Sequence, residues 1–262
     1  MSHALDLTAP GGAHAADDNR DRRPSFGRLV GVELRKMADT KAGLWLLAVV
    51  AIVTVAVNGG VLIWGNRDDL GFSELLAMSG VPQSFLLPVL AILLVTQEWG
   101  QRTGLATFTL TPHRGRIVAA KLVAALGFVV GALVIAVAIA AVLTPLTGHG
   151  WDGVTVAWLG RVFLAIFLGA LQGFAFGALL LSTAFAIVAY FAVPMVVSIV
   201  AQVWTSGTEK LQWIDFGTAK GILYDTAAPT GDQWGHLATA TLLWVVVPFV
   251  AGIWRIQRTE VK

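Results

Sequence analysis

Residues Leu122–Pro145 read LVAALGFVVGALVIAVAIAAVLTP, twenty-four residues without one charged side chain. A helix rises about 1.5 Å per residue, so a run of this length covers the roughly 30 Å hydrocarbon core of a bilayer. Five further runs of the same kind occur along the chain. Together they predict an all-α membrane protein with six transmembrane helices. The expected spans are Leu44–Gly65, Val81–Gln97, Leu122–Pro145, Ala157–Leu181, Ala184–Trp204 and Gly235–Trp254.

The composition agrees with this prediction. Of the 262 residues, 56% are hydrophobic and 13% are charged, whereas about a quarter of a typical soluble domain is charged. The absence of cysteine excludes disulfides and thiolate metal sites. The five histidines are scattered, so no metal site is expected. No basic stretch carries interleaved aromatic residues, so no binding of nucleic acid is expected.

Positive charge predicts the orientation, because Lys and Arg collect on the cytosolic side of membrane proteins. With the N-terminus inside, the cytosolic segments hold fourteen Lys and Arg residues, and the outer loops hold three, Arg67, Lys210 and Lys220. Acidic residues gather in the same outer loops. Both termini of this multi-pass protein are therefore predicted to be cytosolic.

The region before the first span has two parts. Residues 1–24 are rich in Ala, Gly, Asp and Arg without apolar periodicity, which predicts a disordered cytosolic tail. Residues 25–43 predict a basic amphipathic helix on the inner membrane surface, with a cytosolic extension of the first span as the alternative. Its apolar positions are Phe26, Leu29, Val30, Leu34 and Met37, and its charged positions are Arg28, Glu33, Arg35, Lys36 and Asp39. Residues 44–262 form the six-span domain.

Two loops between the spans differ from the rest. Glu98–Lys121 is long, basic and predicted to be cytosolic, so it is the one cytosolic loop large enough to bind a partner. Thr205–Trp234, between spans five and six, is too polar to cross the membrane and too apolar to extend into water. We expect it to form a folded outer segment that lies against the outer helix ends.

The sequence predicts no catalytic machinery on this chain. It contains no HExxH zinc motif and no GxxxxGK[ST] phosphate loop. Any hydrolysis of a nucleotide would therefore be performed by a partner subunit, and no cofactor is expected to bind to this chain.

Glycine residues recur at four-residue spacing within two spans. Such rows let helix backbones approach closely in lipid. They are compatible with packing inside the helix bundle and with a seam between two copies. The rows are Gly127 and Gly131 in the third span and Gly169, Gly173 and Gly177 in the fourth.

A polar stripe follows one side of the fifth span. Its members are Tyr190, Pro194, Ser198 and Gln202. Together with Asn58 of the first span, they are candidates for the lining of a pathway, and hydrogen bonding between helices is the alternative. Arg161, the one charge inside a predicted span, is a functional candidate by default. It also lies close enough to the outer surface to reach water or Asp152.

The loop after the second span resembles a known family. TQEWGQRTGLATFTLTPHRGRIVAAKLV (Thr96–Val123) is similar to the cytosolic connection of ABC-2-type exporter permeases, which begins with Glu, passes a Thr and a Pro with basic residues, and ends with Lys. ELRK before the first span, FGALLLSTAFAIVAYFAVP at the junction of spans four and five, and the tail WRIQRTEVK are also similar to bacterial members.

The resemblance implies the membrane subunit of a bacterial ATP-driven exporter. Two permease copies, as a homodimer, would each bind a cytosolic ATP-binding cassette ATPase, and that partner would hold ATP and Mg. The loop would couple ATP hydrolysis to transport. Its coupling residues would be Glu98, Arg102, Thr103, Pro112, Arg114, Arg116 and Lys121.

Two alternatives remain open at the level of sequence. A non-transporting immunity or assembly protein with six spans would use the same loop for a different partner. An ion-coupled carrier usually has carboxylates within its spans, and no Asp or Glu lies within the predicted ones.

The predicted topology can be tested by cysteine labelling, because the chain has no native cysteine. A cysteine replacing Gly217 in the outer segment should react with a membrane-impermeant maleimide in intact cells. A cysteine replacing Gly115 in the cytosolic loop should react only after the cells are broken. The reverse pattern would show that the orientation is wrong.

Overall fold

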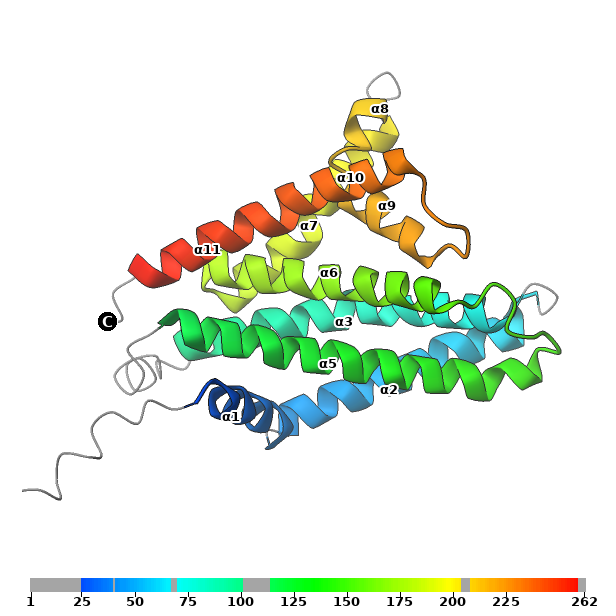
Figure 1. Ribbon diagram of the computed structural model, residues 1–262, viewed down its shortest axis with the longest axis horizontal. Coiled ribbons are helices and arrows are strands. Elements are labelled where there is room, and N and C mark those ends of the chain that lie inside the picture. The colour runs from blue at the N-terminus through cyan, green and yellow to red at the C-terminus, as the bar shows by residue number, and fades with distance from the viewer. Residues whose placement is uncertain (1–24, 40, 67–69, 101–113, 204–207, 259–262) are drawn as a thin grey trace, which may run out of the picture.

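The computed structural model describes residues 25–39, 41–66, 70–100, 114–203 and 208–258, and these residues form helices and turns without a strand (Figure 1). The longer helices are α1 (Phe26–Asp39), α2 (Lys41–Trp64), α3 (Phe72–Gly100), α5 (Arg114–Leu143), α6 (Val156–Leu180), α7 (Thr183–Val203), α10 (Gly231–Thr241) and α11 (Val247–Arg258). A π-helical turn, Leu242–Val246, joins α10 to α11. Short helices α8 (Thr208–Leu211) and α9 (Phe216–Gly221) and the 3-10 turns Thr144–Leu146 and Ile222–Tyr224 complete the set.

Six of the helical segments are long and apolar enough to cross a membrane, which confirms the six-span all-α fold. They are Leu44–Trp64, Phe72–Gln97, Gly115–Leu146, Val156–Leu180, Thr183–Val200 and Gly231–Arg258. The chain is therefore a multi-pass membrane protein.

The second span begins at Phe72, and the prediction that it begins at Val81 is wrong. Ser73, Glu74 and Ser79 make the missed stretch, Phe72–Gly80, look polar, but Ser79, like Gln83 beyond it, is buried and hydrogen-bonded inside the bundle. Ser79 Oγ donates to Leu75 O at 2.9 Å, and Gln83 Nε2 donates to Ala132 O of α5 at 3.1 Å. Polar groups that are satisfied in this way can lie within a span.

The α3 helix continues through Pro82 and Pro88 without a break in its assignment. Pro88 has no N–H, so the carbonyl of Ser84 one turn earlier has lost its intrahelical donor. The Tyr190 hydroxyl of α7 donates to that carbonyl oxygen at 3.2 Å. A side chain from another span therefore replaces the hydrogen bond that the proline removes.

The third and sixth spans are also longer than expected. The α5 helix starts at Arg114, inside the segment predicted as a loop, and the sixth span runs from Gly231 to Arg258 through the π-helical turn. Both extensions carry charged residues at their ends, so hydropathy alone placed the boundaries too far inward.

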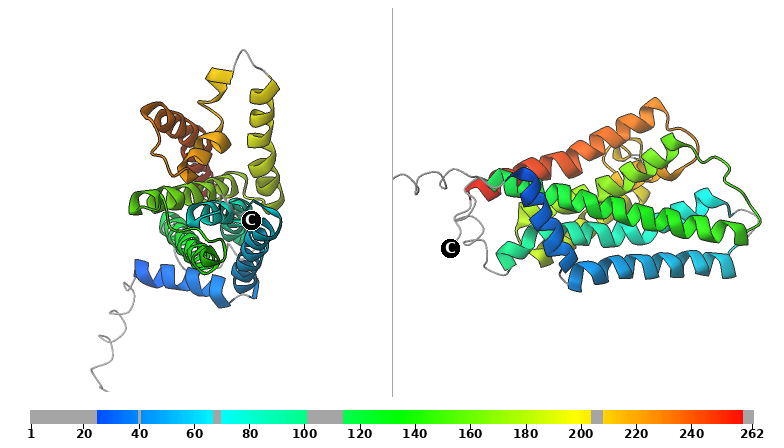
Figure 2. Two further views of the ribbon diagram at one scale, coloured as in Figure 1. Left: turned by 90° about the vertical axis from the view of Figure 1, so that its right-hand side faces the viewer. Right: turned by 60° about the horizontal axis from the view of Figure 1, so that its bottom comes forward.

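The α3 and α6 helices form the centre of the bundle. Within their most apolar stretches, 61% of α3 residues and 72% of α6 residues are buried, whereas the figure for α7 is 11%. The ribbon shows α2, α3, α5 and α6 running side by side along the long axis, with α10 and α11 lying obliquely above α6 in this view (Figure 1). The α7 helix points away from this layer. Seen along the long axis, α7 lies on one side of the molecule, and α10 and α11 lie on the opposite side (Figure 2).

Glycine residues of α6 permit the closest helix contacts. A Cβ at Gly173 would lie 2.5 Å from Pro88 O, and a Cβ at Gly177 would lie 3.2 Å from Ile92 Cα, so both face the α3 backbone. On the other side of α6, a Cβ at Gly252 of α11 would lie 2.8 Å from Ala178 Cβ. Gly127 of α5 faces Leu34 of α1, with 3.4 Å between the added Cβ and Leu34 Cδ2, and Gly131 meets no atom within 4 Å.

The two ends of the bundle carry opposite charge. At one end, here called the basic end, lie α1, the start of α5 and the end of α11 with Arg255 and Arg258. At the opposite, acidic end lie Glu74, Asp152 and the segment that connects α7 to α10 (Figures 1 and 2). The α1 helix crosses the basic end and packs against α5 and α2.

Replacing Gly173 by Ala should destabilise the bundle, because the new methyl group would overlap the α3 backbone at Pro88. Overpacking of this kind costs about 1–3 kcal/mol. Gly131→Ala is the matched control, since its methyl group meets no neighbour, and it should leave stability unchanged or slightly raise it. Thermal unfolding of both variants in the same detergent compares them, and equal midpoints would contradict the assigned contact.

Candidate functional site

A cluster of three charges, two of them buried, joins α1 to α5 at the basic end. Lys121 Nζ lies 2.9 Å from Glu33 Oε2, and Lys36 Nζ lies 2.8 Å from Glu33 Oε1. The side chains of Glu33 and Lys121 are only 6% and 4% exposed. Taking two charges out of water is costly unless they are paired and bonded, so this contact holds α1 in one position on α5.

The pKa of Glu33 is lowered by its partners. Burial is the largest single influence and raises the pKa, but the charge of Lys121 and the hydrogen bonds from Lys36 and Lys121 together outweigh it. The ion pair therefore contributes its whole stabilisation of the docked α1 when the pH is above 4.5, the ordinary pKa of a glutamate. This contribution is lost as the pH falls through the lowered value of the folded state.

The sequence listed Glu33 among the charged positions of α1, and the structure shows that its side chain is buried against α5. Glu33 is 4% exposed, while Phe26 and Leu34, which were assigned to the apolar face, are 41% and 37% exposed. The reason is the approach of Lys121, which is distant in the chain and supplies a countercharge on the α5 side of the helix.

The predicted coupling residues are described only in part. Arg102, Thr103 and Pro112 lie outside the described residues. Glu98 lies in the last turn of α3 and Arg114 is the first residue of α5, and their side chains also lie outside the description. Arg116 and Lys121 lie in the first turns of α5. Of the coupling residues, the structure thus brings Lys121 into contact with α1.

The polar stripe of α7 makes contacts within the chain. Tyr190 is buried against α3 through its bond to Ser84, and Ser198 Oγ donates to Asp215 Oδ1 of the α7–α10 segment at 3.1 Å. Pro194 is half-buried, and Gln202 lies in α7 with its side chain outside the description. These contacts are hydrogen bonds between helices, the alternative that the sequence left open.

Asn58 is buried between α2 and α3. Its Nδ2 donates to Thr54 O at 3.0 Å and to Ser79 Oγ at 2.9 Å. Its Oδ1 and the Gln83 Oε1 are buried without a hydrogen-bond partner. Asn58 therefore belongs to the α2–α3 contact, with no link in the described residues to the stripe on α7.

The α7–α10 segment lies against the acidic end of the bundle. Trp158 Nε1 of α6 donates to Tyr224 O at 3.0 Å, and the Tyr224 ring fills the space above Gly80 of α3. Arg161 donates to the carbonyl oxygens of Thr226, at 3.0 Å, and of Ala227. Arg161 thus binds the backbone of this segment to α6, and it does not pair with Asp152 in the structure.

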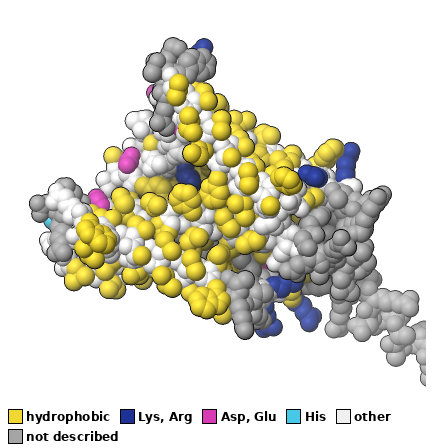
Figure 3. All heavy atoms as spheres, turned by 180° about the vertical axis from the view of Figure 1, so that it is seen from behind, with side chains coloured by type: hydrophobic (Ala, Val, Ile, Leu, Met, Phe, Trp, Pro, Cys, Tyr) yellow, Lys and Arg dark blue, Asp and Glu magenta, His cyan; other side chains and the backbone are white. Residues whose placement is uncertain are grey.

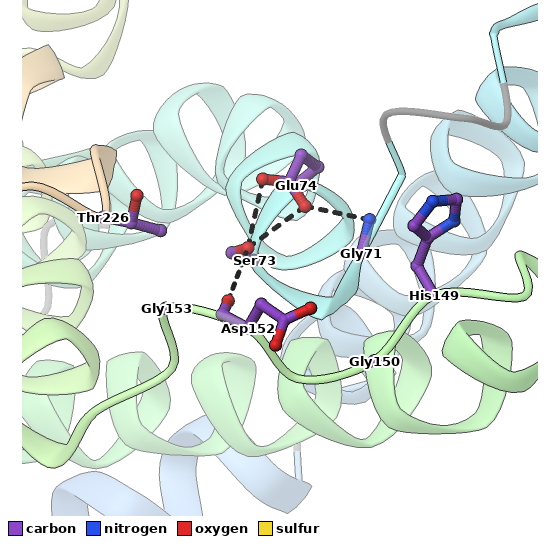
Figure 4. A pocket seen from close by; sticks show the side chains of 8 residues that line it. All are labelled: Gly71, Ser73, Glu74, His149, Gly150, Asp152, Gly153 and Thr226. Atoms are coloured by element: carbon purple, nitrogen blue, oxygen red, sulfur yellow. Dashed lines mark hydrogen bonds between the residues drawn. The ribbon is translucent and has the colours of Figure 1, made fainter.

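A surface recess of about 330 Å³ opens at the same end, between the start of α3 and the α5–α6 connection (Figure 4). Glu74 Oε2 accepts from Gly71 N at 2.9 Å and from Ser73 Oγ at 3.0 Å, so one carboxylate is already engaged. Within the described residues, no group of three or more His, Asp or Glu could hold a metal ion. The recess is lined by Gly71, Ser73, Glu74, His149, Gly150, Asp152, Gly153 and Thr226.

Comparison with known proteins gives no family assignment. No family model matches the chain, and a search of curated proteins found no match. The function is therefore inferred from the residues and their geometry.

Lys121→Met should release α1 from α5, because it leaves Glu33 buried without its main countercharge. Breaking a buried pair from one side costs about 3–5 kcal/mol. The double variant Glu33→Leu with Lys121→Met should recover much of that loss, since it leaves neither charge behind. Hydrogen exchange of the α1 amides measures the docking directly. Unchanged protection in the single variant would show that the ion pair does not hold α1.

Proposed function

We propose that this protein is the membrane-spanning permease subunit of an ATP-driven exporter and that a separate cytosolic ATPase drives it. The observation that carries the proposal is the buried contact between Glu33 and Lys121. It joins the helix that emerges from the 101–113 connection to the helix that crosses the basic end of the bundle.

This contact supplies what a coupling loop needs. A partner bound to residues 98–121 would move the start of α5, and a rigid ion pair passes that movement to α1 and on to α2, which follows at Lys41. Isolated surface ion pairs contribute little to stability, whereas a buried pair requires its geometry to be kept. The position of the pair favours transmission of movement over simple anchoring to lipid.

The ATPase and its ATP and Mg belong to the partner, because this chain has no phosphate loop. The basic end would face the cytosol and hold both termini, by the positive-inside rule, in a bacterial cell membrane. The exposed face of α7 is apolar along its length and is a candidate seam for a second copy. It includes Phe185, Val188, Met195, Val196, Ile199 and Val203.

The distribution of carboxylates disfavours an ion-coupled carrier. Within the six spans as the structure describes them, the acidic residues are Glu74 and Asp232, and each lies in the first turn of its helix. Proton and sodium carriers usually place such groups near the middle of the bilayer. A non-transporting membrane protein remains the second candidate, and an ATP-binding cassette ATPase encoded beside this chain would count against it.

The proposal predicts that Glu98→Ala uncouples the ATPase from transport while insertion and abundance stay normal. Glu98 ends the second span at a surface where anionic lipid favours cations, so its carboxylate is better explained by a protein partner. Purified permease and ATPase in reconstituted vesicles give both rates. We expect the ratio of transport to hydrolysis to fall about tenfold, within the range that loss of one coupling contact between two sites gives.

Gln97→Ala is the matched control for this experiment, since it changes the neighbouring side chain without removing a charge, and its ratio should stay at the unmodified value. Normal transport at normal hydrolysis in Glu98→Ala would falsify the coupling role of the loop. Failure of any ATP-binding cassette ATPase to co-purify with the chain would instead favour the non-transporting candidate.

A further inference from the structure

The side chain of Lys220 reaches from the α7–α10 segment into the contact between α6 and α7. Lys220 lies in the last turn of α9. A Cβ placed on Gly169 of α6 would lie 3.2 Å from Lys220 Nζ, 3.9 Å from the Tyr190 hydroxyl oxygen and 3.9 Å from Pro88 Cγ. The missing side chain at Gly169 therefore leaves the space that the ammonium group occupies, and groups from α3, α6, α7 and α9 meet there.

The ammonium group has no countercharge among the described residues. No ion pair or hydrogen bond joins Lys220 to another described residue, although the Phe216 ring lies 5.6 Å from its Nζ. The acid nearest in sequence, Asp215, is already engaged. Its Oδ1 accepts from Gly217 N at 3.1 Å and from Ser198 Oγ at 3.1 Å, and its Oδ2 accepts from Thr218 Oγ1 at 2.7 Å.

A cation in this position is destabilised by the loss of water. Burial lowers the pKa of Lys220 to about 8, and a nearby aromatic ring offsets only about 1–2 kcal/mol of such a penalty. Buried charges in proteins are normally paired. The Tyr190 hydroxyl cannot donate to an added anion, because its proton is used by Ser84 O. Lys220 is consequently the group that an incoming anion would bind.

The surroundings of Lys220 are apolar on two sides. Phe216, Leu168 and Ala165 belong to one hydrophobic cluster, and Tyr190 and Ile92 belong to another. The rear face of the molecule, which includes the diverging α7, is covered largely by hydrophobic side chains (Figure 3). Lys220 itself is half-buried, so part of it can be reached from outside. A ligand that pairs with the ammonium group and also covers the apolar surface around it has an anionic head and an apolar tail.

We propose that Lys220 binds the anionic head group of an amphipathic molecule beside Gly169, where α6, α7 and α9 meet. The head group pairs with Nζ, and the tail lies along the apolar surface of the neighbouring helices. The anion is either a phospholipid of the bilayer or a transported amphiphile. Its identification with a transported molecule rests on the proposed function, whereas the binding itself needs neither ATP nor a partner subunit.

The test measures the binding of dodecyl phosphate to the full chain in phosphatidylcholine nanodiscs, with dodecanol as the uncharged probe. Binding is followed as the rise in the thermal unfolding midpoint with probe concentration. The unmodified chain and Lys220→Arg should prefer dodecyl phosphate by about tenfold or more, the value of a charged hydrogen bond. Lys220→Gln should lose that preference.

Gly169→Ala probes the space without changing the charge. Its methyl group would occupy the position beside Nζ and should also abolish the preference for dodecyl phosphate, while Gly131→Ala, which meets no neighbour, should keep it. Equal binding of the two probes by the unmodified chain, or an unchanged preference in Lys220→Gln, would overturn the proposal.

A stability measurement without any probe gives an independent check. Lys220→Met removes a desolvated cation that has no partner among the described residues and should raise the unfolding midpoint in phosphatidylcholine nanodiscs. A large fall would show that the ammonium group already has a partner in the protein, and the proposal would then be wrong.

The source of the anion is decided by adding phosphatidylglycerol to the nanodiscs. If a bilayer lipid occupies the site, this lipid should weaken dodecyl phosphate binding to the unmodified chain and leave Lys220→Gln unaffected. If the site selects a transported amphiphile, binding should stay unchanged. Either result supports anion binding at Lys220, and neither depends on whether an ATPase partner exists.

Discussion

The contact between the backbones of α6 and α3 at Gly173 and Pro88 is the constraint on which the other helices depend. Lipid is as apolar as the side chains, so helices in a bilayer associate through close packing and polar bonds. Glycine at 173 and 177 removes the side chains that would hold α6 away from α3. The same face of α3 then presents the carbonyl of Ser84, which Pro88 leaves free, to Tyr190 of α7. One contact thus fixes the relative places of three spans.

The charged residues are distributed according to a second rule, since each buried charge must find a partner. At the basic end, Glu33 and Lys121 satisfy each other across 2.9 Å. At the acidic end, Asp215 is satisfied by α9 and Ser198, and Arg161 by two backbone carbonyls. Lys220 departs from this rule among the described residues. Lys220 is therefore a candidate binding site, because a desolvated charge without a protein partner is costly to retain.

Some of these features were predictable from the sequence because they depend on local pattern. Runs of apolar residues gave the six spans, and glycine spacing identified the face of α6 that packs. The start of α3 was missed because Ser73, Glu74 and Ser79 look polar until their hydrogen-bond partners in the folded bundle are known. The pairing of Glu33 with Lys121, and the approach of Lys220 to Gly169, join residues far apart in the chain. Neither has a local signal, beyond a single Glu in a basic helix and one of two Lys residues in an acidic loop.

The attachment of α7 shows how the two ends of the protein could act on each other. At the basic end, Thr183 shares a 2.7 Å hydrogen bond with Thr96 of α3, and Tyr190 bonds α3 near the middle of the helix. Further along, Ser198 bonds Asp215, at the start of the helix that carries Lys220. The first half of α7 is therefore tied to α3, and its second half is tied to α9. A displacement of α3 at the basic end would therefore be passed along α7, through its Pro194, to α9, which would change the space around Lys220.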